Sequence, residues 1–255
     1  MGSGPSASSP VDRPRPGTDQ TGRVSGGLQA SVAARIPGAA ALGLVVPPSA
    51  PLVPATLLAD REWTAQVIAS RAGATGDRRV AATVWWYSTS AVLLTPSLAG
   101  LATGVPLSGR LADTSLVFRP DGLPVASVSA ARADDVAAEL RKTLTAVVTA
   151  VAAAGRMRVR PLWAIATDSI ANQLLAIGRA LGNVPAGTAL AEPLATAVGA
   201  PLPVPRYVDV AGARFTRRAS CCLVEELPAG ARCTSCPRRP PGERRALLEQ
   251  AARWF

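Results

Sequence analysis

Histidine is absent from all 255 residues of the sequence. Without an imidazole, the chain cannot form a Ser-His-Asp triad or a Cys-His nucleophilic pair. It also cannot supply the histidine ligands of a Rieske centre or of a mixed Cys/His zinc site. Any metal site in this protein must therefore be built from cysteine thiolates or carboxylates.

Lysine is nearly absent too, because Lys142 is the single one among 27 basic residues. The formal charge of +10 thus rests on arginine, which pairs well with carboxylates and phosphates. The arginine, alanine and proline content is also typical of a GC-rich genome, so the charge by itself names no partner. Aromatic residues are few and are not interleaved with the arginines, and we expect no nucleic-acid partner.

Long uninterrupted hydrophobic runs are missing, although 48% of the residues are hydrophobic and can fill a substantial core. The run from 80 to 101 comes closest to a membrane span, but Pro96 and several polar residues interrupt it. The first 27 residues lack the apolar region of a secretory signal. We therefore expect a cytoplasmic protein, with at most a peripheral association with the cytoplasmic face of the membrane.

Composition divides the chain into three predicted parts. Residues 1–27 are rich in Gly, Ser, Pro and Arg and predict a disordered tail. Residues 28–205 predict a helical α+β scaffold that carries the substrate. Residues 206–255 predict a cysteine-rich metal-binding segment that ends in a helix. The expected fold class is α+β, a helix-rich domain with a small antiparallel sheet and this C-terminal segment.

Periodicity and breaker residues predict the individual elements. Helices are expected over 28–36, 54–72, 78–94, 134–155, 161–181, 188–198 and 242–254. Strands are expected over 105–112, 115–118 and 123–128, and a second hairpin over 206–210 and 213–216. The sequence Arg119-Pro120-Asp121-Gly122 is a turn signature between the second and third strands.

Several polar or aromatic side chains have two interpretations. Trp85, Trp86 and Tyr87 either line a substrate cleft or pack in a helix core, and we favour packing. Asp168, Asn172 and Gln173 either face a polar cavity or lie on a solvent face, and we favour solvent. Trp254 is expected to anchor the last helix.

All four cysteines lie between residues 221 and 236, in the pattern C-C-x10-C-x2-C. Four clustered thiols without a secretory signal favour a metal site in a reducing compartment over disulfides. A zinc ribbon usually has two C-x2-4-C knuckles, and only Cys233 and Cys236 fit that spacing. Adjacent residues of an extended chain point oppositely, so Cys221 and Cys222 reach one small ion only with a contorted backbone. The spacing predicts an unusual four-cysteine metal site, either zinc or iron–sulfur.

The stretch from Arg217 to Leu223, together with Cys233-Thr234-Ser235-Cys236-Pro237, resembles the C-terminal segment of the FhuF-like ferric-siderophore reductases. The resemblance implies that Cys221, Cys222, Cys233 and Cys236 bind a [2Fe–2S] cluster. It further implies an oxidoreductase that reduces chelated Fe(III) to Fe(II) by one electron and so releases iron. The partners would be a ferric siderophore and a protein electron donor, ferredoxin-like or a flavoprotein, since no dinucleotide fingerprint is present.

Arginines flank these cysteines in sequence. Arg217, Arg218, Arg232 and Arg238 could tune the electrostatics of the site or dock an anionic chelate or an acidic donor protein. Solvated arginines on an exposed loop are the alternative, and Glu225 and Glu226 are available to pair with them. Two other functions stay open: a zinc-stabilised binding module, and an electron-transfer or siderophore-binding partner that does not itself reduce.

Overall fold

The computed structural model describes residues 27–254. The tail expected over 1–27 lies outside this range except for Gly27, which begins α1 (Gly27–Ala33). The fold class is confirmed: the chain forms a helix-rich α+β structure with small antiparallel sheets.

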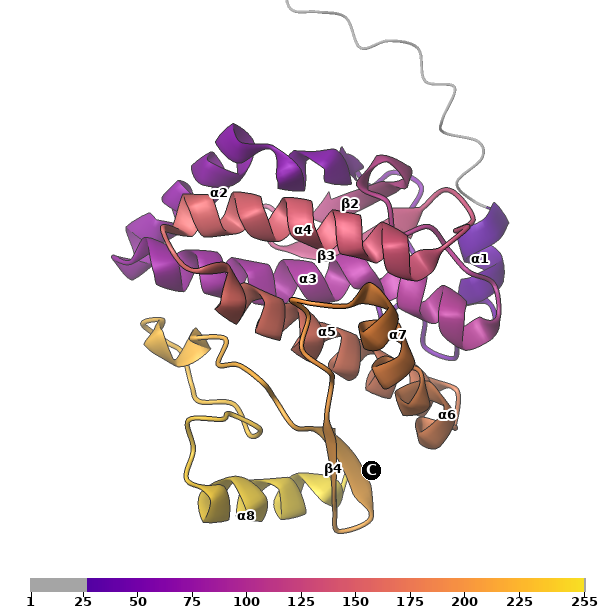
Figure 1. Ribbon diagram of the computed structural model, residues 1–255, viewed down its shortest axis with the longest axis vertical. Helices are drawn as coiled ribbons and strands as arrows, with labels where there is room; N and C mark the ends of the chain where they lie inside the picture. The colour runs from indigo at the N-terminus through magenta and orange to yellow at the C-terminus, as the bar shows by residue number, and fades with distance from the viewer. Residues whose placement is uncertain (1–26, 255) are drawn as a thin grey trace, which may run out of the picture.

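Four long helices form a helical body. These are α2 (Arg61–Thr75), α3 (Arg78–Thr103), α4 (Val136–Gly155) and α5 (Val159–Ala180). The central helix α3 packs against α2, α4 and α5, and β3 (Pro124–Ser129) also lies against it. In Figure 1, α2 and α4 lie above α3, and α5 lies below it. None of the helices in the described part of the chain is long and apolar enough to cross a membrane.

Packing of the aromatic residues in α3 explains why this helix is central. Trp85 and Trp86 are fully buried, and the indole Nε1 of Trp86 donates a 2.8 Å hydrogen bond to the carbonyl oxygen of Leu162 in α5. The interpretation of these tryptophans as core residues is confirmed. Both indoles contribute buried apolar area, and Trp86 adds one directional hydrogen bond.

A three-stranded sheet covers one side of α3. Its order is β1 (Val53–Pro54), β2 (Thr114–Phe118) and β3, all antiparallel, with Leu116 opposite Ser127. The predicted turn joins β2 to β3, and Gly122 adopts φ +76° there. The side chain of Gln29 in α1 bonds to the backbone of Ser127 and Ser129, which fastens α1 to the sheet edge.

The strand expected over 105–112 is wrong. In this segment, Leu107 forms an isolated bridge with Arg132, and η2 (Leu111–Asp113) follows. The buried carboxylate of Glu139 accepts bonds from the Gly109 N–H and the Ser108 hydroxyl. The bond to Gly109 satisfies a backbone N–H that would otherwise need a partner in a ladder, so the segment is an ordered loop.

Other predictions differ mainly in their boundaries. Helix α3 continues through Pro96 and ends at Thr103, where Gly104 takes a left-handed conformation. Asp135, and not Asp134, caps α4. Two elements replace each of two expected helices. The helix expected over 54–72 is replaced by η1 (Ala55–Ala59) and α2, and the helix expected over 188–198 is replaced by the end of α6 (Val184–Ala189) and by α7 (Ala191–Val198).

The C-terminal segment has little regular structure. It contains the expected hairpin of β4 (Tyr207–Val210) and β5 (Ala213–Thr216), then η3 (Val224–Glu226), and finally α8 (Pro241–Ala252). Figure 1 shows β4 and α8 below α5, with the connecting coil rising toward the helical body between them. The Tyr207 hydroxyl donates to the Ala171 carbonyl and fastens this segment to α5.

The expectation for Trp254 is wrong. Its side chain is 84% exposed, whereas Leu248 and Ala252 are the buried residues of α8. Trp254 lies beyond the last helical residue, so the helix does not carry its ring toward the hairpin.

The division of the chain into a scaffold of residues 28–205 and a metal-binding segment of residues 206–255 stays a prediction.

Candidate metal centre

The structure brings the four cysteines together in two pairs, and all four are free thiols. The Sγ atoms of Cys221 and Cys236 lie 4.0 Å apart. Cys222 and Cys233 share one guanidinium nitrogen, Arg218 Nη1, at 3.5 Å and 3.3 Å. Each pair therefore joins one cysteine of the adjacent C-C dipeptide to one cysteine of the C-x2-C motif.

The backbone of residues 217–239, here named the cysteine loop, explains how adjacent cysteines reach different partners. Leu223 adopts a left-handed conformation with φ +60°, which is rare for a residue with a side chain. This bend lets the Leu223 N–H donate to the sulfur of Cys221 at 3.5 Å. At the other end, the Cys236 N–H bonds to the Cys233 carbonyl and closes a tight turn.

Gly230 permits the close return of this loop. A β-carbon at this position would lie 1.7 Å from the carbonyl oxygen of Val224, well inside contact distance. Only glycine fits there without a backbone shift. The close approach fixes η3 beside the second half of the loop.

Arg218 occupies the interior of the site. Its side chain is 3% exposed, and its guanidinium carbon lies 4.9 Å from the centre of the Tyr87 ring in α3. Its Nε lies 3.4 Å from a carboxylate oxygen of Asp168. Burial lowers the pKa of Arg218, but the hydrogen bond and charge of Cys222 outweigh it, and the net shift is upward.

Asp168 in α5 holds the start of the cysteine loop. Its carboxylate accepts bonds from the Ala219 N–H at 2.7 Å, the Ser220 N–H at 3.1 Å and the Ser220 hydroxyl at 3.2 Å. Burial raises the pKa of this carboxyl, and the bonds from Ala219 and Arg218 oppose the rise.

The solvent-face interpretation is therefore wrong for Asp168, whose side chain is 1% exposed, while Asn172 and Gln173 are half-buried. A signal was present in the sequence. Asp168 lies three residues from both Ile165 and Ala171, so it falls on the apolar stripe of the helix. A carboxylate on such a stripe needs a buried partner.

The other flanking arginines do not reach the thiols in the same way. Arg232 pairs with Glu225, and Arg238 Nη1 lies 2.9 Å from oxygens of both Glu225 and Glu226. The pairing foreseen for these glutamates is confirmed. Arg217 is exposed, and its backbone N–H bonds to Arg206.

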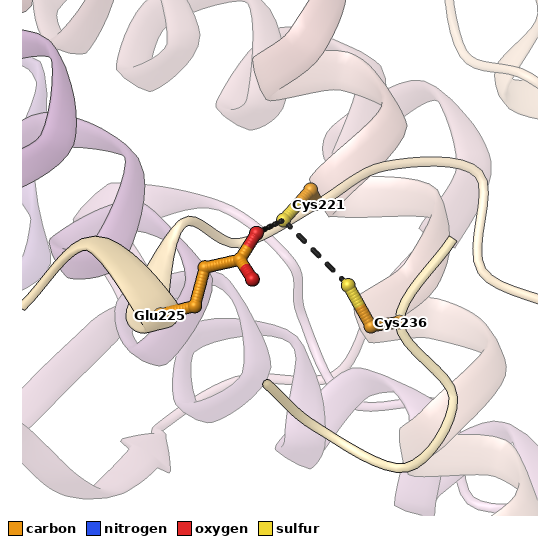
Figure 2. A group of neighbouring side chains, drawn as sticks. All are labelled: Cys221, Glu225 and Cys236. Atoms are coloured by element: carbon orange, nitrogen blue, oxygen red, sulfur yellow. Dashed lines mark hydrogen bonds between the residues drawn. The ribbon is translucent and has the colours of Figure 1, made fainter. Parts of the chain in front are cut away.

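Glu225 lies against the Cys221–Cys236 pair. Its Oε1 is 4.0 Å from the Cys221 sulfur, and Figure 2 shows its carboxylate directed at that atom. Within residues 27–254, Cys221, Glu225 and Cys236 form the one group of three potential ligand atoms within 4.8 Å of one another. Hydrogen bonds from Arg232 and Arg238 lower the pKa of Glu225, so its carboxylate is ionised.

Cys222 is the cysteine of the site with the strongest bias toward a thiolate. A hydrogen bond from Cys233 lowers the pKa of Cys222 to about 5, and the Val224 N–H and Arg218 add to this effect against burial. The same bond, with burial, raises the pKa of Cys233. A thiolate is the form of cysteine that binds metals, so Cys222 has the chemistry of a metal ligand.

The donor set fits a two-iron cluster better than one zinc ion. Zinc with Zn–S bonds near 2.3 Å needs its four sulfurs about 3.8 Å apart in a single tetrahedron. Here the thiols form two pairs, and the compact three-atom group contains only two of them. Two pairs suit the two metal positions of a [2Fe–2S] cluster, which is held by sets of four cysteine thiolates.

One unpartnered donor supports an anionic occupant. Arg218 Nη2 is buried and has no hydrogen-bond partner among residues 27–254. Buried donors are usually paired, and the inorganic sulfide and thiolates of an iron–sulfur cluster carry the negative charge that would satisfy this one.

Comparison with protein-family models, with curated proteins and with solved structures finds no match for this chain.

Proposed function

We propose that Cys221, Cys222, Cys233 and Cys236 hold a [2Fe–2S] cluster and that the protein is an oxidoreductase that reduces siderophore-bound Fe(III). The observation that carries the proposal is the gathering of the four thiols in two pairs, one of which lies against the buried guanidinium of Arg218. When bound, the cluster supplies transfer of one electron at a time. The siderophore as substrate rests on the resemblance of the cysteine loop to the FhuF-like reductases.

The chemistry of the substrate fits a one-electron site. Conversion of Fe(III) to Fe(II) takes one electron, and the hard oxygen donors of siderophores hold Fe(III) far more tightly than Fe(II). Reduction therefore releases the metal without breaking a covalent bond of the chelator. The electron comes from a protein donor, ferredoxin-like or a flavoprotein, and the reaction belongs to the cytoplasm, at most near the membrane surface.

The residues of this chain supply positioning and charge. Asp168 fixes the loop through the Ala219 and Ser220 amides, so the thiols stay in place while charge changes nearby. Arg218 places a positive charge beside Cys222 and Cys233. N–H groups such as that of Leu223 donate to sulfur and lower the electron density there.

A single-ion site is the second candidate, and one observation favours it. Cys221, Cys236 and Glu225 could bind one zinc ion through two sulfurs and one oxygen, with the fourth position open. In that case, the protein is a zinc-stabilised module, and Cys222 and Cys233 are not ligands.

Anaerobic purification followed by iron, sulfide and zinc analysis separates these candidates. We expect two irons and two sulfides per chain with visible absorption, and Cys222→Ser should remove most of that absorption. Thr234→Ala is the matched control, because it changes an exposed residue of the same loop and should leave the absorption unchanged. A colourless protein with one zinc would overturn the cluster.

A ferrous-trap assay tests the reaction itself. Reduced protein is mixed with a ferric hydroxamate or catecholate chelate and an Fe(II)-specific dye, with donor-only mixtures as background. We expect stoichiometric Fe(II) above background, and loss of it in Cys222→Ser. No reoxidation and no Fe(II) would indicate a binding partner or an electron carrier for another acceptor.

A further inference from the structure

The two thiol pairs lie in different electrostatic surroundings. The Cys222–Cys233 pair faces the guanidinium of Arg218, whose side chain is 3% exposed. The Cys221–Cys236 pair faces the carboxylate of Glu225, whose side chain is 14% exposed. A buried positive charge thus lies next to one half of the site, and a carboxylate paired with two exposed arginines lies next to the other.

Neighbouring charges modify this contrast without reversing it. Asp168 pairs with Arg218, but its carboxylate also accepts three hydrogen bonds from Ala219 and Ser220. It contacts the guanidinium at Nε. A different guanidinium nitrogen, Nη1, is the atom that contacts the sulfurs of Cys222 and Cys233. Arg232 and Arg238 both pair with Glu225, and their charges also act on Cys236 and Cys221, although both side chains are more than 40% exposed and screened by water.

We propose that Arg218 directs the electron taken up by the site to the iron held by Cys222 and Cys233, and that it sets the potential at which this electron is accepted. This inference rests on the [2Fe–2S] cluster proposed above. An added electron makes its iron more negative, and a buried positive charge a few ångströms away stabilises that state strongly because the local dielectric constant is low. The Cys221–Cys236 half has no buried positive charge of this kind, since Glu225 beside it is paired with the exposed Arg232 and Arg238. The donor class is a one-electron reductant, and the ferric chelate is the acceptor.

The arrangement also answers how adjacent cysteines share the cluster. Cys221 and Cys222 belong to different pairs, so each would bind a different iron of the proposed cluster. The left-handed Leu223 is the backbone feature that permits this divergence. Arg218 acts through the sulfurs and does not touch the substrate, so it is a positioning residue.

The first test is a redox titration of Arg218→Gln, after iron and sulfide analysis has shown that the cluster is present. We expect its affinity for the electron to fall at least tenfold, which corresponds to a potential about 59 mV lower for one electron. Arg218→Lys keeps the charge and should recover most of the shift. Arg217→Gln removes an equal charge from the exposed neighbouring residue and is the matched control, with a shift less than half as large. Equal shifts at positions 217 and 218 would overturn the proposal.

The second test needs only the unmodified protein. In the reduced state, NMR signals of cysteine β-protons bound to ferrous and ferric iron differ in shift and in their dependence on temperature. We expect Cys222 and Cys233 to show the ferrous pattern and Cys221 and Cys236 the ferric pattern, with assignments from single Cys→Ser variants that retain iron. The reversed assignment, or an electron shared equally, would overturn the proposal even if Arg218→Gln fails to bind iron. Absence of iron and sulfide in the unmodified protein would instead remove the proposed function, and this inference with it.

Discussion

The helical body and the cysteine loop are held together by different forces. The helical body packs large apolar side chains, such as Trp85, Trp86 and Leu144, with almost no exposure. The cysteine loop buries Cys222, Leu223 and Cys236 but has no regular element longer than the three-residue η3. Its order comes from a carboxylate, a guanidinium and backbone N–H groups. The first region is stabilised by burial of apolar area, which tolerates small shifts, and the second by polar contacts that depend on geometry.

This difference separates the region that supplies most of the apolar core from the region that holds the candidate site. A polar cluster that is fully satisfied fixes one arrangement, whereas a cluster that loses one member leaves buried charge without a partner. A substitution in the helical body should therefore lower the stability of the whole chain, whereas one at the cysteine loop should disturb the loop locally. Three substitutions test this contrast.

Trp86→Ala should have the largest effect. It removes a fully buried indole from the helical body and leaves the Leu162 carbonyl without its 2.8 Å bond. Large-to-small changes of this kind cost about 3–5 kcal/mol in the free energy of unfolding. Urea denaturation followed by circular dichroism measures the loss, which should not depend on whether metal is bound.

Asp168→Ala should have the next largest effect, and a more local one. It leaves Arg218 without its carboxylate and the Ala219 and Ser220 amides without their acceptor. We expect a loss of about 3 kcal/mol, at the lower end of the range for a broken buried pair, because Arg218 keeps its contacts with two thiols.

Hydrogen exchange gives the location of this loss. Amides of the cysteine loop should lose protection in Asp168→Ala, while those of α3 and α4 keep it. Asp168→Asn retains an acceptor oxygen and should lose less. Asn172→Ala, one turn further along α5, is the control and should change stability by less than about 0.5 kcal/mol. A global loss of protection would show that the two regions are not distinct in the way described.

Trp254→Ala should have the smallest effect. The indole is 84% exposed and follows the end of α8, so little apolar area is lost from the folded state. We expect a change within about 0.5 kcal/mol in the free energy of unfolding. Thermal unfolding monitored by tryptophan fluorescence would detect a larger change, which would mean that Trp254 contributes to the packing of α8 after all.

The sequence predicted the helical body well because its signals are local. Apolar residues at helical spacing, together with an aspartate before α4 and glycines near the helix ends, locate α4 and α5 to within a few residues. The loop at 105–112 was missed because its backbone partners are the side chains of residues such as Glu139, about 30 positions away. Local propensity carries no information about such a partner.

The candidate site, like the fold, could be predicted only where its signals are local in the sequence. The four cysteines were evident from spacing, but their pairing required the left-handed Leu223 and the position of Arg218. Asp168 was misplaced on a solvent face because polar residues in helices usually lie there. Its partners, Ala219 and Ser220, contribute backbone N–H groups, and every residue except proline has one. No sequence pattern could single them out.

The position of Asp168 along the chain has a consequence for biosynthesis. Its helix is translated 51 residues before Ala219, and N-terminal parts of a protein generally fold first. The acceptor for the loop amides is then already in place when the cysteines emerge from the ribosome. In the docked loop, Cys221 and Cys233 are partly accessible, and Cys222 and Cys236 are buried. A metal delivered to the docked loop would thus meet one accessible thiol from each pair.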